Sequence, residues 1–164
     1  MSIWAHCQAI QDPEFKRMLS RLHRAGSDTK QLMDGIGHAL LESIDRNFEE
    51  QGRPEPWAPL SWAGLRNRVR GRLSKRDGTM RAAPLRKMAA VKILQWTGRL
   101  RRSIKTKADA NRVAVGTNLI YARYQQEPWD GHKPGRPFLM VQQQDWQTIR
   151  DMAFRFYEMQ MAGA

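Results

Sequence analysis

The side chains that most often perform catalysis or bind metals are few in this chain, and their spacing does not bring them together. The four histidines are His6, His23, His38 and His132, and no two of them have the i, i+4 spacing of a helical zinc site. The only cysteine, Cys7, directly follows His6. Adjacent side chains diverge, so these two do not form a nucleophile and its base. We therefore expect no metal, no cofactor and no enzyme activity.

Glycine-rich and acidic segments support the same expectation. Gly35-Ile36-Gly37 has no strand before it and no lysine after it, so it lacks the pattern of a phosphate-binding loop. Glu42, Asp45 and Glu49 lie in a segment of helical periodicity. We interpret these carboxylates as the solvated face of a helix rather than as a catalytic pair.

Positive charge is concentrated in one segment of the chain. The 164 residues carry 28 basic and 16 acidic side chains, a formal charge of +12. Residues 66–107 contain 15 basic side chains and one acid, Asp77, which leaves 13 basic and 15 acidic side chains elsewhere. This segment therefore carries the whole excess, and it can attract nucleic acid or an acidic protein surface.

Arginine is suited to phosphate because its donors match phosphate geometry, and contacts to several phosphates make binding steeply dependent on salt. Trp62 and Trp96 flank the basic segment and are able to stack on bases. No recognition helix emerges, however, and proline and glycine interrupt the charge. The candidate contacts to DNA or to an acidic partner are Arg66, Arg68, Arg70, Arg72, Lys75 and Arg76.

Two helices are predicted in the first third of the chain. Asp12 and Pro13 are typical of a helix start, and Gly26 of a helix end. From about Asp28, which we expect to cap the next helix, apolar residues recur at every fourth position, and this pattern predicts a long amphipathic helix that ends before Gly52. Its predicted buried residues are Leu32, Ile36, Leu40, Ile44 and Phe48.

A proline-rich connection and a basic insertion follow. Three prolines within residues 54–59 predict an extended connection, with Trp57 and Leu60 as its anchors to the core. Residues 62–92 are expected to form a basic, mobile insertion. The spacing of its apolar residues fits a strand and a helix equally well, and glycines interrupt both patterns. We therefore predict a solvated loop over 66–85 and a short helix over about 85–95.

The remainder predicts a small sheet and a last helix. Alternation around 103–107 and 113–115, with turn residues at 109–111, predicts a β-hairpin. We also predict a short helix at 121–124, a loop over 127–137 and a short buried strand at 138–141. The last helix is expected over 144–161. Its predicted buried face is Trp146, Ile149, Met152, Ala153, Phe156 and Met159.

This order of elements predicts a single α+β domain over residues 1–164. We expect a small antiparallel sheet on which the long N-terminal helix and the C-terminal helix pack, with a long basic loop attached. No run of apolar residues approaches the length of a membrane span, and the first residues lack a secretory pattern, so we expect synthesis in the cytoplasm. Trp129 lies in a loop rich in proline and glycine, where an interface anchor and a plain loop residue are equally good interpretations.

Short motifs follow one another in a fixed order along the chain. They are Phe48-Glu49-Glu50-Gln51, Trp57-Ala58-Pro59-Leu60, Ile93-Leu94-Gln95-Trp96-Thr97-Gly98-Arg99-Leu100-Arg101-Arg102-Ser103-Ile104, Val113-Ala114-Val115-Gly116-Thr117, Tyr121-Ala122 and Arg136-Pro137-Phe138-Leu139. This ordered series resembles the phage virion morphogenesis (tail completion) family, and the resemblance covers about residues 15–156. It is interrupted after Tyr121-Ala122, where the family usually has histidine, glutamine, an aromatic residue and glycine, but this chain has Arg123-Tyr124-Gln125-Gln126.

The resemblance implies a structural protein of the bacteriophage virion. It implies that the protein completes the tail, as a tail terminator or as a head–tail connector of the neck. It also implies that copies of the chain assemble into a six-fold ring around the DNA path. The implied partners are further copies of the chain, the tail tube and neck proteins, and DNA in the channel, but no membrane. The implied place of assembly is the bacterial host cytoplasm. The alternative is a non-specific nucleic-acid-binding protein that uses residues 66–107. The candidate motif and interface residues are Trp57, Leu60, Thr97, Gly98, Leu100, Tyr121, Trp129, Arg136, Pro137 and Phe138.

Overall fold

One long helix organises the molecule. The computed structural model describes residues 3–6, 13–24, 28–69, 79, 81–128 and 134–162. The elements in chain order are β1 (Ile3–His6), α1 (Pro13–Arg24), α2 (Lys30–Glu49), α3 (Trp62–Arg68), α4 (Ala82–Ala89), α5 (Arg99–Arg102), β2 (Lys105–Asp109), β3 (Arg112–Thr117), the 3₁₀ helix η1 (Ile120–Ala122), α6 (Arg123–Gln126) and α7 (Gln143–Ala162).

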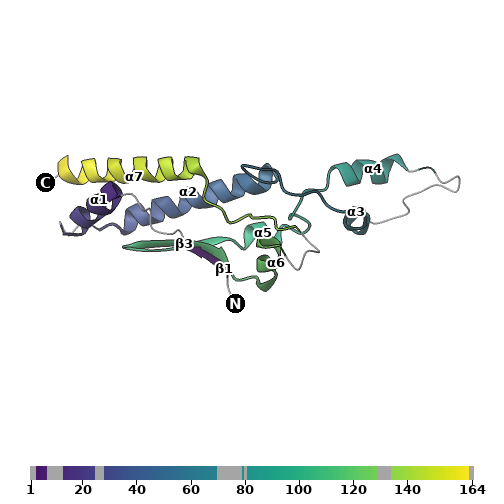
Figure 1. Ribbon diagram of the computed structural model, residues 1–164, viewed down its shortest axis with the longest axis horizontal. Coiled ribbons are helices and arrows are strands. Elements are labelled where there is room, and N and C mark those ends of the chain that lie inside the picture. The colour runs from purple at the N-terminus through teal and green to yellow at the C-terminus, as the bar shows by residue number, and fades with distance from the viewer. Residues whose placement is uncertain are drawn as a thin grey trace.

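The helix α2 lies between the sheet and α7 (Figure 1). The sheet is antiparallel, with strand order β1-β3-β2. Thr106 of β2 and Ala5 of β1 both pair with Val115 of the central strand. The α+β class, the hairpin and the two long helices are therefore confirmed, while β1 was not predicted.

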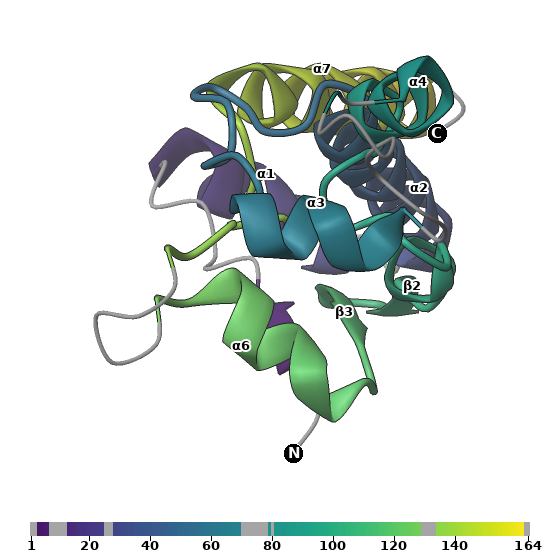
Figure 2. The same cartoon turned by 90° about the vertical axis from the view of Figure 1, so that its right-hand side faces the viewer.

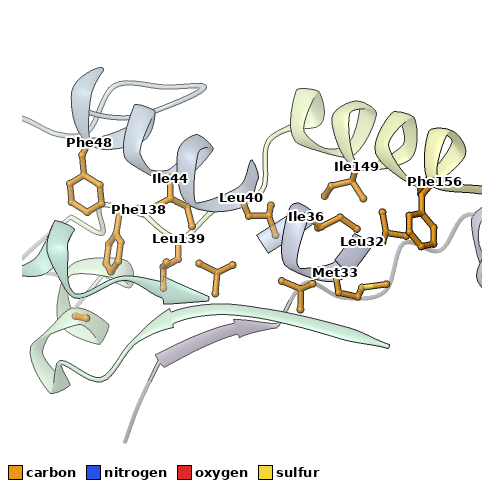
Figure 3. Packing of buried hydrophobic residues seen from close by; sticks show 14 of the residues in the cluster. Leu32, Met33, Ile36, Leu40, Ile44, Phe48, Phe138, Leu139, Ile149 and Phe156 are labelled. Atoms are coloured by element: carbon orange, nitrogen blue, oxygen red, sulfur yellow. The ribbon is translucent and has the colours of Figure 1, made fainter. Parts of the chain in front are cut away.

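The predicted stripe of α2 forms the centre of the core. All five of its residues are buried, and Phe48 is completely so. Figure 3 shows Ile149 and Phe156 of α7 on one side of α2 and Met33 directed toward the strands. Gly37 permits this arrangement, because a Cβ at that position would lie 3.3 Å from the Cβ of Thr106 in β2. Glycine is less favourable than alanine inside a helix, but here its missing side chain allows the sheet to approach α2.

The start of α2 and the buried face of α7 each differ in one detail from prediction. The N-cap position of α2 is Thr29, while the Asp28 carboxylate accepts a hydrogen bond of 3.0 Å from the backbone N–H of Lys30. Ile149, Ala153 and Phe156 of α7 are buried and Trp146 is partly so. Met159 is 65% exposed, so its assignment to the buried face was wrong.

The predicted strand at 138–141 is not a strand. Phe138 and Leu139 are buried as expected, but a side chain takes the place of a neighbouring strand. The amide oxygen of Gln126 accepts hydrogen bonds of 3.0 Å from the backbone N–H groups of both residues, and its amide nitrogen donates to the Leu139 carbonyl at 3.1 Å. One glutamine thereby satisfies the buried backbone without a sheet partner.

The described parts of the basic insertion are helical rather than loop. Ser61 caps α3 by accepting a 3.2 Å hydrogen bond from the N–H of Gly64, and α4 spans 82–89 instead of 85–95. Val69, Pro84 and Met88 are buried, which gives these short helices an apolar contact. Residues 70–78, with Arg70, Arg72, Lys75 and Arg76, lie outside the described residues, as does Trp129.

Within the described residues, no helix is both long enough and apolar enough to cross a bilayer.

Candidate functional site

Three aromatic side chains from separate motifs meet at the C-terminal end of α2. The Phe48 ring lies 5.6 Å from the Trp57 ring, edge to face, and 5.6 Å from the Phe138 ring. The indole N–H of Trp57 donates to the Pro137 carbonyl at 3.0 Å. Such pairs add to the stability that burial provides. The anchoring role predicted for Trp57 is confirmed, and Leu60 is half-buried.

Arg136 attaches the proline-rich connection to this cluster. Its guanidinium donates to the carbonyls of Ala58 at 2.9 Å and Pro59 at 3.1 Å, and its backbone N–H donates to the Gln125 carbonyl at 2.7 Å. Burial, together with the neighbouring charge of Arg68, lowers the pKa of Arg136. Arg136, Pro137 and Phe138 therefore make internal contacts that hold three segments together.

The Thr97-Gly98-Arg99-Leu100 motif forms a tight turn into α5. Gly98 has φ of 67° and occupies the N-cap position, a conformation that favours glycine. A Cβ there would lie 2.7 Å from the Nη1 atom of Arg102. Arg102 also donates to the Thr97 carbonyl at 2.9 Å, and Leu100 is buried. The turn thus places Thr97 and Arg99 at the surface while Leu100 enters the core.

Arg101 joins α5 to the acidic side of α2. Its guanidinium forms ion pairs with both oxygens of Asp45 and, at 2.9 Å, with Glu49. The hydrogen bond from Arg101 lowers the pKa of Asp45, and the same contact raises the pKa of Arg101. Asp45 and Glu49 do lie on the largely exposed face of α2, as predicted, but their ion pairs with Arg101 were not predicted. No spacing signal predicts this contact, because its partners are more than fifty residues apart in sequence.

The ion pair between Arg101 and Asp45 is expected to make stability depend on pH. A carboxyl group whose pKa is lowered by folding contributes stability above its ordinary pKa of 3.8, and this contribution is lost as pH falls through the lowered value. Arg101→Ala should lower the free energy of unfolding by about 1 kcal/mol near pH 7, because the pair is partly exposed, and by less near pH 3, which lies below the ordinary pKa of the carboxyl group. Urea titrations at both values measure this.

Arg112→Ala is the matched control, because its pair with Asp109 is more exposed, at 66% and 55% of the two side chains. It should change stability by only a few tenths of a kcal/mol at either pH. An equal loss at both pH values in Arg101→Ala would contradict the assigned role of Asp45.

A groove of about 370 Å³ opens next to the same turn. Among the described residues, it is lined by arginine and aromatic side chains and by no carboxylate. Trp96 is 68% exposed and Tyr121 is 41% exposed, which is unusual for side chains of this size. Arg68 is held at the groove by a 3.0 Å hydrogen bond to the Lys92 carbonyl. The side chains that line the groove include Arg68, Leu94, Trp96, Arg99, Tyr121 and Gln125.

The candidate residues therefore divide into two groups. Thr97, Leu100, Tyr121 and Arg68 come together at the groove. Trp57, Arg136, Pro137 and Phe138 do not line it and instead make the contacts of the aromatic cluster and the proline-rich connection. Arg66 is exposed on α3 and does not line the groove. Arg99 and Gln125 were not predicted as site residues, because the groove forms between segments that are distant in sequence and no local pattern predicts their approach.

Polar groups buried in the described residues all have partners. Ser43 donates to the Asp145 carboxylate at 2.8 Å and accepts from Arg53 at 2.8 Å. Asp145 also accepts from the Gln142 N–H at 2.6 Å, at the start of α7. No group of three or more His, Cys, Asp or Glu side chains within the described residues could hold a metal ion.

Comparison with known proteins gives one match. The model of the phage virion morphogenesis family matches residues 10–157. No curated protein and no solved structure matches the chain.

Proposed function

Because this chain belongs to the phage virion morphogenesis family, whose proteins have a structural role in the virion, we propose that it completes the tail of a tailed bacteriophage and joins the tail to the head. It acts as a tail terminator or connector of the neck, by contacts between proteins and without catalysis. It assembles in the host cytoplasm and remains in the virion.

The observation that carries this proposal is the convergence of the family motifs at one end of α2. The Phe48 ring contacts the rings of Trp57 and Phe138 there, and Leu100, which follows the Thr97-Gly98 turn, belongs to the same hydrophobic core. The cluster belongs to the packed core, and the groove, which shares Leu100 with that core, presents exposed aromatic and basic groups. A packed core next to exposed apolar groups is the usual arrangement of a protein interface.

The proposed mode of action is self-assembly into a ring. The subunit is elongated, with α7 and the α3–α4 pair extending toward opposite ends (Figure 1). Copies that contact one another through two different surfaces form a closed ring when the rotation between them closes. Six copies would surround the DNA path and present one face to the tail tube and the other to the neck proteins.

A second candidate function is contact with DNA through the basic segment. Residues 62–69 and 81–92 carry Arg66, Arg68, Arg81, Arg86, Lys87 and Lys92 and no acidic side chain. α3 and α4 lie at one end of the molecule (Figure 1), so this charge is accessible to a polyanion. In a ring, the same helices would face either the channel or an acidic neighbour.

Light scattering on the purified chain distinguishes the two candidates. The mass is measured with and without a short DNA duplex at low and high salt. A discrete multiple of the 19.0 kDa subunit that is insensitive to DNA supports the assembly function. A monomer that binds DNA at low salt and releases it at high salt, and that loses binding when Arg66 and Arg68 become alanine, supports the nucleic-acid function instead.

A further inference from the structure

The outer face of α7 carries an apolar and acidic stripe that the core does not use. Asp151, Phe154, Glu158 and Met161 follow at intervals of three and four residues, which places them on one side of a helix. All four are exposed, with Phe154 at 40% and Met161 at 45%. Ile149, Ala153 and Phe156 occupy the opposite, buried side. We call Asp151, Phe154, Glu158 and Met161 the α7 stripe.

The groove has the complementary chemistry. Arg68 and Arg99 supply positive charge, while Trp96 and Tyr121 supply exposed aromatic surface. Burial lowers the pKa of Arg68, and no carboxylate of the described residues lines the groove beside it. The α7 stripe would supply the carboxylates of Asp151 and Glu158 to the arginines and the Phe154 ring to the aromatic side chains, although α7 also carries Arg150 and Arg155 outside the stripe.

These two surfaces cannot meet within one chain. Figures 1 and 2 show α7 above α2 and the groove elements α5 and α6 below it, on the far side of the molecule. α2 lies between them (Figure 1). A contact between the α7 stripe and the groove must therefore join two molecules, and it uses a different surface on each. Contacts of this kind leave one free surface of each type, so they propagate until a ring closes.

We infer that the α7 stripe of one subunit docks into the groove of a second copy of this chain, and that this contact builds the ring. The inference rests on the proposed function, which requires self-association, and it identifies the surfaces responsible. DNA is a less suitable occupant because Leu94 and Leu100 contribute an apolar floor that phosphates would not use.

Two variants each remove one surface. The groove variant carries Trp96→Ser and Arg99→Glu, and the stripe variant carries Phe154→Ser and Glu158→Arg. All four side chains are exposed, so folding should be retained, which circular dichroism and thermal melting check. If the groove variant does not fold, Tyr121→Ser alone replaces it. The matched controls are Leu85→Ser with Arg86→Glu on α4, and Met159→Ser on α7, which alter exposed residues outside both surfaces.

The mass of each protein is measured by sedimentation at one concentration. Wild type and both controls should form the same discrete oligomer, and each variant alone should be a monomer. An equimolar mixture of the two variants should form dimers and nothing larger. The intact stripe of the groove variant can bind the intact groove of the stripe variant, and the other two surfaces are defective.

The outcomes separate this inference from the proposed function. If wild type forms a ring and the variants do as well, the ring uses other surfaces and only the inference is overturned. If the groove variant keeps the wild-type mass but loses binding to a DNA duplex, the groove is a nucleic-acid surface, which also overturns it. A wild-type chain that remains monomeric up to the solubility limit would overturn self-assembly and the inference together.

Discussion

Replacing Ile44 with aspartate is expected to unfold the domain, or to lower its free energy of unfolding by about 4 kcal/mol or more. Ile44 is 5% exposed in the middle of α2, at the centre of the main core. A carboxylate there loses its hydration and gains no partner, and the contacts of the isoleucine are lost as well. Ile36→Asp should have the same effect, since Ile36 lies on the same stripe.

Urea unfolding followed by circular dichroism measures this loss. His38→Asp is the matched control, because it introduces the same carboxylate on the exposed side of the same helix. The control should retain nearly the stability of wild type. If both core variants melt at the wild-type temperature, the assignment of the α2 stripe to the core is wrong.

Truncating Phe138 to alanine is expected to lower the free energy of unfolding by about 3–5 kcal/mol. Its side chain is completely buried and contacts the Phe48 ring at 5.6 Å between centroids. Removal of the ring leaves a cavity at the point where α2, the proline-rich connection and residues 136–139 meet. The hydrogen bonds of Gln126 to this backbone remain, so the segment cannot easily move to fill the space.

Chemical denaturation of Phe138→Ala against Leu85→Ala isolates the effect of burial. Leu85 is exposed on α4, so its truncation should cost well below 1 kcal/mol. A loss below about 1 kcal/mol in Phe138→Ala would mean that the aromatic cluster is not a structural centre. The family motif would then have to be explained by intermolecular contacts alone.

Elements with a strong local period could be predicted from the sequence. The four-residue stripe of α2 and the apolar face of α7 each repeat over several turns, and the alternation around the hairpin matches the geometry of strands. These patterns report which side of an element is buried, and burial of that side is the main source of stability. The α+β class could be predicted from these patterns. The anchoring role of Trp57 could also be predicted, because a large aromatic side chain in an extended proline-rich connection is best stabilised by packing on the core.

Features that depend on contacts between distant segments could not be predicted. The Gln126 side chain replaces a strand for Phe138 and Leu139, and glutamine at that position carries no signal of this role. The basic segment contained no clear period, so α3 was missed and the helix expected over 85–95 was placed too late in the chain. The short apolar contacts of these helices form only when the chain is folded.

The candidate site shows the same division. Its individual residues, among them Thr97, Leu100 and Tyr121, could be selected from the sequence because their ordered motifs resemble a known family. Their assembly into a groove, with Arg99 at its edge, required the turn at Gly98 and the ion pairs of Arg101 with Asp45 and Glu49. Local patterns encode which side of an element is apolar, and this much could be predicted from the sequence. The relative placement of the elements comes from many weak contacts that become favourable only together, so only the tertiary structure decided it.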